Sequence, residues 1–213
     1  MIQTLSFDHK GGFYFYRVHN KKLDICNGHD GLRNYLDKMF YSCPDEFFNE
    51  GPRSSALKFN LPVDLKMITG HEISMLTREA LKVNKDRFKA GHSKVQVFLL
   101  EMDDKTIACE VPIWLNHEEL KNFNELFNSN LPLTGHIDLI RIEDEKIWIW
   151  DYKPGSFEEK FASTQVFFYA LMLSKRTGIP LDKFRCGYFD ENYAFVFKPE
   201  EKLLERESIK QFI

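Results

Sequence analysis

Residues 135–155, GHIDLIRIEDEKIWIWDYKPG, decide the fold of this chain. Two stretches rich in β-branched and aromatic residues, 135–142 and 146–152, flank the acidic residues 143–145. This pattern predicts two antiparallel strands joined by a tight turn. The second strand carries the run IWIW, which is apolar on both faces and gives way directly to a polar end. The hairpin therefore predicts a buried strand that ends in charged residues.

The register of this hairpin opposes two carboxylates. With a loop of two residues (144–145) or four residues (143–146), opposed residues have numbers that sum to 289, so Asp138 faces Asp151. Directly opposed residues have Cβ atoms about 4.5–5.5 Å apart, and like charges there destabilise the pair unless something neutralises them. Paired carboxylates supply the hard oxygen ligands that Mg²⁺ prefers, and Mg²⁺ also takes oxygens from a substrate phosphate. A loop of odd length would instead put the two carboxylates on opposite faces.

Asp151 and Lys153 form the end of the second strand. The spacing Asp-x-Lys also occurs at four other places, most of which we expect to be surface turns. Only at Asp151 does the pair end a strand that is apolar on both faces. Side chains two residues apart project from the same face of a strand. The sequence therefore predicts a carboxylate and an ammonium held together at the end of a sheet strand.

The remaining segments predict a mixed α/β domain. We expect one hairpin over 13–18 and 23–26, helices over 30–40, 70–89 and 117–127, paired strands over 95–102 and 105–114, a long helix between Gly155 and Gly178, and strands over 184–189 and 193–197. The expected fold class is α/β, with a mixed central sheet flanked by helices. We expect one domain over residues 1–213, in which residues 1–65 form an N-terminal hairpin and helix elaboration and residues 70–197 form the core.

Composition places the chain among soluble globular proteins. Of its 213 residues, 43% are hydrophobic and 29% are charged, which does not fit a disordered, fibrous or membrane chain. The longest apolar run covers residues 166–173, far below the roughly 20 residues that a membrane-spanning helix needs. The N-terminal sequence lacks the apolar segment of a secretory signal, so we expect a cytoplasmic or other intracellular location without a membrane partner.

The charge balance restricts the mode of nucleic-acid binding. With 29 basic and 32 acidic residues, the net charge of −3 argues against a protein that coats nucleic acid through bulk charge. Residues 78–94 nevertheless hold six basic residues against two acidic ones. Within them we predict contacts to nucleic acid by Lys82, Lys85, Arg87 and Lys89. The alternative is an ordinary solvated helix face.

Three motifs in order resemble a known family. Gly135-His136-Ile137-Asp138, Asp151-Tyr152-Lys153-Pro154-Gly155, and the pair Gln165 and Tyr169 are similar to the G-x-I-D, D-Y-K-x-G and Q-x-x-x-Y series of RecB-like and Cas4-like nucleases in the PD-(D/E)XK superfamily. The resemblance covers about residues 105–170. It implies a restriction-endonuclease-like core that cleaves DNA phosphodiesters, at single-stranded or duplex ends, with Mg²⁺ or Mn²⁺.

The resemblance also implies roles for particular residues. Asp138 and Asp151 would be metal ligands, and Lys153 would position or activate the attacking water. Gln165 and Tyr169 lie at i and i+4, so a helix would place both on one face towards the strand ends. The residues thus define one site at the end of the hairpin.

Two further positions follow from the same family. Members often have a glutamate on the strand before G-x-I-D, and Glu110 fits that place as a support for the metal site or for Lys153. Alternatively, Glu110 is an ordinary exposed strand residue. Members also place a histidine on an upstream helix as a nitrogen ligand. We choose His71 for this role, with His92 as the second choice.

The cysteines argue against one property of the Cas4-like members. These carry an iron–sulfur cluster on one early and three late cysteines. The chain has Cys26, Cys43, Cys109 and Cys186, so only one cysteine follows residue 153. A cluster needs four converging thiolates, and we therefore expect no iron–sulfur cluster.

Three functions remain in competition. A metal-dependent DNA nuclease is the preferred interpretation, because the residues Asp138, Asp151 and Lys153 are all present. A non-catalytic nucleic-acid-binding protein on a nuclease fold would be expected to lack at least one of these three residues. A dimeric junction-resolving endonuclease of the same superfamily would differ by its two-fold dimer and its preference for branched DNA.

Overall fold

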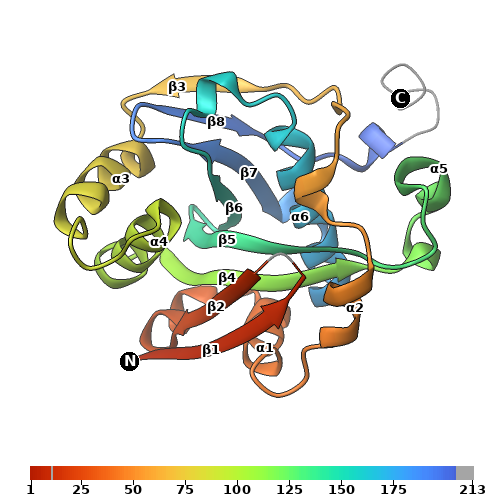
Figure 1. The fold of residues 1–213 in the computed structure, drawn as a ribbon, viewed down its shortest axis with the longest axis horizontal. Helices are drawn as coiled ribbons and strands as arrows, with labels where there is room; N and C mark the ends of the chain where they lie inside the picture. Colours follow the sequence, from red (N-terminus) through yellow and green to blue (C-terminus); the bar gives the residue numbers. More distant parts are fainter. Residues whose placement is uncertain (11, 205–213) are drawn as a thin grey trace.

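A mixed β-sheet forms the centre of the molecule (Figure 1). The computed structural model describes residues 1–10 and 12–204, and these contain a sheet of eight strands in the order β1-β2-β4-β5-β6-β7-β8-β3. Neighbouring strands run antiparallel except β6 and β7, which are parallel. The strands are β1 (Ile2–His9), β2 (Gly12–His19), β3 (Lys66–Thr69), β4 (Thr106–Leu115), β5 (Leu133–Glu143), β6 (Lys146–Tyr152), β7 (Phe184–Phe189) and β8 (Tyr193–Phe197). The predicted fold class, a mixed sheet flanked by helices, is confirmed.

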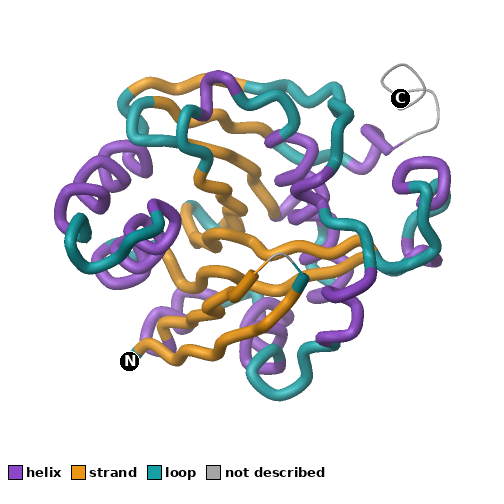
Figure 2. Tube along the Cα trace, in the orientation of Figure 1, coloured by secondary structure: helices purple, strands orange, loops and turns teal. Residues whose placement is uncertain are grey.

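Helices cover the sheet, as the colouring by secondary structure in Figure 2 shows. They are α1 (Asp30–Lys38), α2 (Asp45–Glu50), α3 (Glu72–Val83), α4 (Gly91–Met102), α5 (Phe123–Phe127) and α6 (Ala162–Thr177), with short 3-10 turns between them. Among the described helices, none is long and apolar enough to cross a membrane.

The buried strand β6 separates two apolar cores. Ile147 and Ile149 belong to the core that includes α6, whereas Trp150 belongs to the core that includes α3 and α4. This division follows from the alternation of side chains along a strand. Asp151 continues the series of Ile147 and Ile149, and so it lies on the α6 side of the sheet at the end of the strand.

The predicted register of the β5–β6 hairpin is confirmed. Leu139 pairs with Trp150, and Glu143 pairs with Lys146, so opposed residues have numbers that sum to 289. The two loop residues, Asp144 and Glu145, both adopt positive φ angles of 49° and 57°. Positive φ at both central positions is typical of the tight hairpin turn whose twist matches that of the strands.

The predicted strand over residues 95–102 is wrong, because this segment lies in helix α4. Residues 95–100 are all buried, between α3 and the sheet. A helix that is buried on most sides has a continuous apolar run, which periodicity alone does not distinguish from a strand. The predicted helix over 70–89 is correspondingly shorter: α3 ends at Val83, and Gly91 begins α4.

The predicted N-terminal hairpin is also wrong in its partner strand. β2 pairs with β1, with Phe7 opposite Tyr14, whereas residues 23–26 lie in a 3-10 turn, Asn20–Cys26. β1 has few apolar residues because only one of its faces is buried, so its signal is weak. Helix α2 and strand β3 were likewise not predicted from the sequence.

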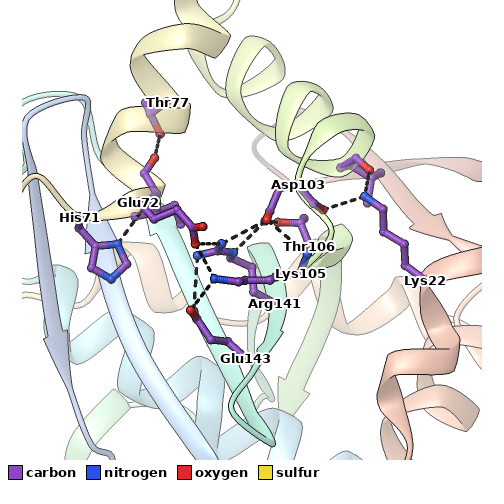
Figure 3. A network of polar contacts seen from close by, with 11 residues as sticks. Lys22, His71, Glu72, Thr77, Asp103, Lys105, Thr106, Arg141 and Glu143 are labelled. Carbon is purple, nitrogen blue, oxygen red and sulfur yellow. Dashed lines mark hydrogen bonds and ion pairs between the residues drawn. The ribbon is translucent and has the colours of Figure 1, made fainter.

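A buried ionic network ties α3 to the central strands (Figure 3). Arg141 on β5 is fully buried, and its Nε donates a hydrogen bond to Asp103 Oδ2 at 2.8 Å. Its Nη2 donates to Glu72 Oε2 on α3 at 2.8 Å. Lys105 Nζ bridges Glu72 and Glu143 at 2.7 and 2.6 Å. Arg141 and Asp103 compensate each other in a buried position, whereas Glu72 and Lys105 are partly exposed.

We expect Arg141→Ala to lower the free energy of unfolding by about 3–5 kcal/mol, because it leaves the buried carboxylate of Asp103 without its partner. Urea denaturation measures the loss. Arg87→Ala is the matched control, since Arg87 forms an exposed bidentate pair with Glu101 and should cost about 1 kcal/mol or less. Equal losses in the two variants would contradict a stabilising role for the network.

Candidate active site

Two buried carboxylates lie at the end of the β5–β6 hairpin. The observed register, continued by one residue pair, opposes Asp138 to Asp151, and these residues are 7% and 2% exposed. The backbone N–H of Tyr152 donates to Asp138 Oδ2 at 2.8 Å, which orients this carboxylate. Burial, followed by repulsion from Asp151, raises the pKa of Asp138 to about 6. Burial and mutual repulsion therefore disfavour two ionised carboxylates at this site.

Lys153 provides the neighbouring positive charge. Its Nζ lies 2.7 Å from Asp151 Oδ2. Its backbone N–H donates to Phe189 O at 2.8 Å, which extends the β6–β7 pairing past the end of β6 and positions the side chain. Burial by itself lowers the pKa of Lys153, but the attraction of Asp151 and Asp138 outweighs burial and raises this pKa above its usual value. Lys153 is therefore a cation at neutral pH.

Helix α6 supplies two polar residues to the same strand end. Gln165 Nε2 lies 3.2 Å from Asp151 Oδ1 and 2.7 Å from Tyr169 Oη, and it donates to both. Burial, and then the negative charge of Asp151, raise the pKa of the Tyr169 hydroxyl, which therefore stays protonated. A Cβ at Gly135 would lie 2.4 Å from the Tyr169 ring, so the glycine permits this close approach.

Glu110 lies across from Asp138 on the adjacent strand. The pairs Cys109–Leu139 and Val111–Ile137 flank these two residues. Glu110 has a φ of 53°, an uncommon backbone conformation for a residue other than glycine, and its Oε1 accepts a hydrogen bond from Gln96 Nε2 at 2.6 Å. Burial, followed by repulsion from Asp138, raises the pKa of Glu110 to about 8. Glu110 is thus half-buried and repelled by Asp138, unlike an ordinary exposed strand residue.

The structure brings His92, and not His71, to the carboxylates. His92 Nε2, in the first turn of α4, lies 3.7 Å from Asp138 Oδ2. His71 is the N-cap of α3: its Nδ1 accepts a hydrogen bond from the N–H of Ile73 at 3.2 Å, and its ring packs against Trp150. His71 lies beside the ionic network of Figure 3, and burial, followed by the charge of Arg141, lowers its pKa. The histidine in contact with Asp138 is therefore His92, the second choice.

The predicted basic strip precedes His92 along the chain. Lys82 is in the last turn of α3, and Lys85, Arg87 and Lys89 lie in the connection over residues 84–90 that leads to α4. The three lysines are exposed. Arg87 already pairs with Glu101 through both nitrogens at 2.7 Å. The strip is therefore a helix end and a loop, and not one continuous helix face.

Sequence reasoning missed a segment of the N-terminal region that lies against the site. Arg53 and Thr134 form a parallel bridge, and Ser54 Oγ donates to Thr134 O at 3.0 Å. A Cβ at Gly135 would lie 2.5 Å from Ser54 Oγ, so Ser54 and Tyr169 both contact this glycine. These contacts join residues about 80 positions apart, and no local sequence pattern indicates them.

The cysteines occupy separate elements. Cys26, Cys109 and Cys186 are buried in a 3-10 turn, in β4 and in β7, and Cys43 is half-buried before α2. We expect purified protein to contain no stoichiometric iron, because these positions offer no four converging thiolates. Iron analysis after anaerobic purification is the measurement, and about four iron atoms per chain would contradict the expectation.

Donor chemistry at the strand end fits a divalent cation. Asp138 and Asp151 offer hard carboxylate oxygens, and His92 offers a nitrogen close to Asp138. Burial, followed by repulsion from Asp151, raises the pKa of Asp138, and a bound cation would oppose that repulsion. Within the described residues, a group of three potential ligands, His9, Cys43 and Asp45, lies elsewhere, with its ligand atoms within 4.8 Å of one another.

The chain belongs to the PD-(D/E)XK nuclease superfamily, whose sequence model matches residues 36–212. The matched region includes the β5–β6 hairpin, the helix α6 and every residue of the strand-end site described above. Nucleases of this superfamily use divalent metal ions and act on nucleic acid. No curated protein and no solved structure matches the chain.

Proposed function

We propose that this chain is a metal-dependent DNA nuclease of the RecB-like or Cas4-like branch, using Mg²⁺ or Mn²⁺ to hydrolyse phosphodiester bonds. The observation that carries the proposal is the buried pair Asp138 and Asp151 with Lys153 Nζ at 2.7 Å from Asp151. Buried charges without a role in folding cost free energy, and such groups gathered at a strand end are typical of functional sites. We also propose that residues 1–213 act as one domain, because β1 and β2 belong to the same sheet as the core.

Asp138 and Asp151 would hold the cation, with His92 in the role first given to His71. When bound, a divalent ion polarises the scissile phosphate and lowers the pKa of a water molecule. Gln165 holds Asp151 through Oδ1, and its second hydrogen bond, to Tyr169, fixes the amide. Backbone and side-chain contacts thus orient both carboxylates before substrate arrives, which keeps the cost of reorganisation low.

Lys153 acts as a charged positioning group in this proposal. An ammonium has three N–H donors, and the contact with Asp151 uses one of them. The remaining donors can hold an attacking water or a phosphate oxygen for in-line displacement. Because the two carboxylates raise its pKa, Lys153 does not readily release a proton, which favours positioning over general-base catalysis.

A cleavage panel tests the function. Single-stranded, duplex and branched DNA are incubated with Mg²⁺ or Mn²⁺, with Asp151→Ala as the matched inactive variant. We expect cleavage by the wild type only when metal is present. Binding without cleavage of every substrate would instead support a non-catalytic nucleic-acid-binding protein, and cleavage restricted to branched DNA by a dimer would support a junction-resolving enzyme.

We expect the variant Lys82→Gln/Lys85→Gln/Lys89→Gln to bind DNA more weakly, by the same factor for every DNA sequence. These exposed lysines shortly precede His92, which contacts Asp138, and they would contact phosphates. Each lost phosphate contact should reduce the slope of log affinity against log salt by about 1. Binding isotherms at several salt concentrations measure both effects. The control replaces three exposed lysines outside the strip, Lys38, Lys121 and Lys198, and an equal loss there would show that only the net charge matters.

A further inference from the structure

A second group of potential metal ligands lies at the N-terminal side of the fold, separate in its residues from the carboxylates of the hairpin. His9 is the last residue of β1, Cys43 precedes α2, and Asp45 is the first residue of α2. One ligand atom from each of the three lies within 4.8 Å of those of the other two. His9 Nε2 and Asp45 Oδ1 are 3.0 Å apart. Two segments of the chain, the end of β1 and residues 43–45, thus bring a nitrogen, a sulfur and an oxygen donor close together.

His9 is held rigidly in this group. Its side chain is fully buried, and its ring stacks between Phe48 at 4.3 Å and Phe7 at 4.9 Å. On its inner side, His9 Nδ1 lies 2.9 Å from Nε2 of the buried His136. A metal-binding histidine usually donates its other ring N–H to a fixed acceptor, which sets the ring orientation and its basicity. His136 provides that acceptor, and Nε2 of His9 is left facing Asp45.

We infer that His9, Cys43 and Asp45 bind a transition-metal cation, of which Zn²⁺ fits the donors best. Imidazole, thiolate and carboxylate are all zinc ligands, at distances of about 2.0–2.3 Å, and three of them leave one position of a tetrahedron for water. Mg²⁺ does not suit the site, because a thiolate is a soft ligand. The side chain of Asp45 is 62% exposed, so the ion can enter from solvent.

The protons of the histidine pair balance in both states. Without metal, Arg53 Nη2 donates to His136 Nδ1 at 3.3 Å, His136 Nε2–H donates to His9 Nδ1, and His9 Nε2–H donates to Asp45. With metal on His9 Nε2, each histidine carries its hydrogen on Nδ1 instead, and Cys43 releases one proton. Arg53 then loses its bond to His136 but keeps its contacts with Lys10 O and the ring of Tyr14.

The ion would fasten the end of β1 to the start of α2, beside strand β5 through His136. This role does not depend on the proposed nuclease activity. The ion's three ligands are also different residues from Asp138, Asp151 and Lys153, so a failure of one proposal leaves the other standing.

Cobalt binding to the full chain tests the inference. Co²⁺ bound to a thiolate gives a strong charge-transfer absorption, and its visible bands report tetrahedral geometry. We expect one equivalent of Co²⁺ to give both signals, and Zn²⁺ to displace it. Cys43→Ser should abolish the charge-transfer band. Asp45→Asn, a change at an exposed position that should not impair folding, should weaken Co²⁺ affinity by about tenfold or more.

Two matched controls identify the site. Cys26→Ala removes a cysteine outside the group, and Asp138→Asn alters the hairpin carboxylates, so both should keep the band and its one-to-one stoichiometry. The inference is overturned if Co²⁺ gives no thiolate band, if the band survives Cys43→Ser, or if Asp138→Asn abolishes it. Unchanged Co²⁺ affinity in Asp45→Asn would remove the aspartate from the ligand set and overturn the three-residue site.

Discussion

Lys153→Ala should reduce DNA cleavage by at least about 10²-fold, because it removes a charged donor fixed beside the reacting phosphate. Binding of DNA should change little, since the exposed basic strip lies on α3 and the α3–α4 connection. Lys153 is largely buried and paired with Asp151, so its loss should also lower the melting temperature in metal-free buffer. Saturating Mg²⁺ should restore much of that stability by replacing the lost positive charge.

Single-turnover cleavage, DNA-binding isotherms and thermal melts of the same preparation separate these effects. Lys153→Arg should also be poor, because a planar fork replaces a compact ammonium. Lys160→Ala, at an exposed lysine on the same loop, is the control and should cleave normally. Wild-type turnover by Lys153→Ala in a metal-replete assay would remove Lys153 from the proposed mechanism.

Asp138→Asn should abolish cleavage and the stabilisation of the fold by metal. For the wild type, a ligand at 100 times its Kd stabilises the native state by about 2.7 kcal/mol. This corresponds to a rise of roughly 5–10 °C in Tm for a chain of this size. The variant lacks one of two carboxylate ligands and should show little rise. Without metal it should be as stable as the wild type or more stable, because one of two repelling charges is gone.

The pH dependence of the same variant has a definite sign. In the folded protein the pKa of Asp138 is about 6, above its ordinary value of 3.8, so the folded state holds this proton more tightly than the unfolded state does. The stabilisation of the folded state by this bound proton is therefore lost as pH rises from about 4 to 6. Asp138→Asn should lack that loss. Glu110, with a pKa of about 8, continues the same trend to higher pH in the wild type, and more weakly in Asp138→Asn, which lacks the repulsion from Asp138.

Thermal melts from pH 4 to 9, with and without Mg²⁺, measure both effects. Because the cation binds ionised carboxylates, the wild-type Tm increase with Mg²⁺ should be small below pH 6 and larger above it. Asp104→Asn, at an exposed aspartate outside the site, is the control and should behave as wild type. An Asp138→Asn variant that cleaves DNA at the wild-type rate, or whose Tm still rises with Mg²⁺, would contradict the shared cation.

Local patterns in the sequence are sufficient for the centre of the candidate site. The register that opposes Asp138 and Asp151 depends on alternation along two adjacent strands and on a two-residue turn, all within a short segment. The pairing of Gln165 with Tyr169 depends on the spacing of one helix turn. Both contacts can be predicted without knowledge of the rest of the fold, because the interacting residues are near neighbours along the chain.

Tertiary structure alone decided which other residues join this centre. Whether residues 95–102 form a strand or a helix depended on their burial between α3 and the sheet. That choice created a second helix start at Gly91 and brought His92, in place of His71, to Asp138. The approach of Ser54 to Gly135 and the meeting of His9 with Cys43 and Asp45 join distant segments. Packing free energy, rather than local periodicity, selects contacts of this kind. The sequence alone therefore determined the carboxylate pair and the lysine, whereas only the folded chain determined which residues surround them.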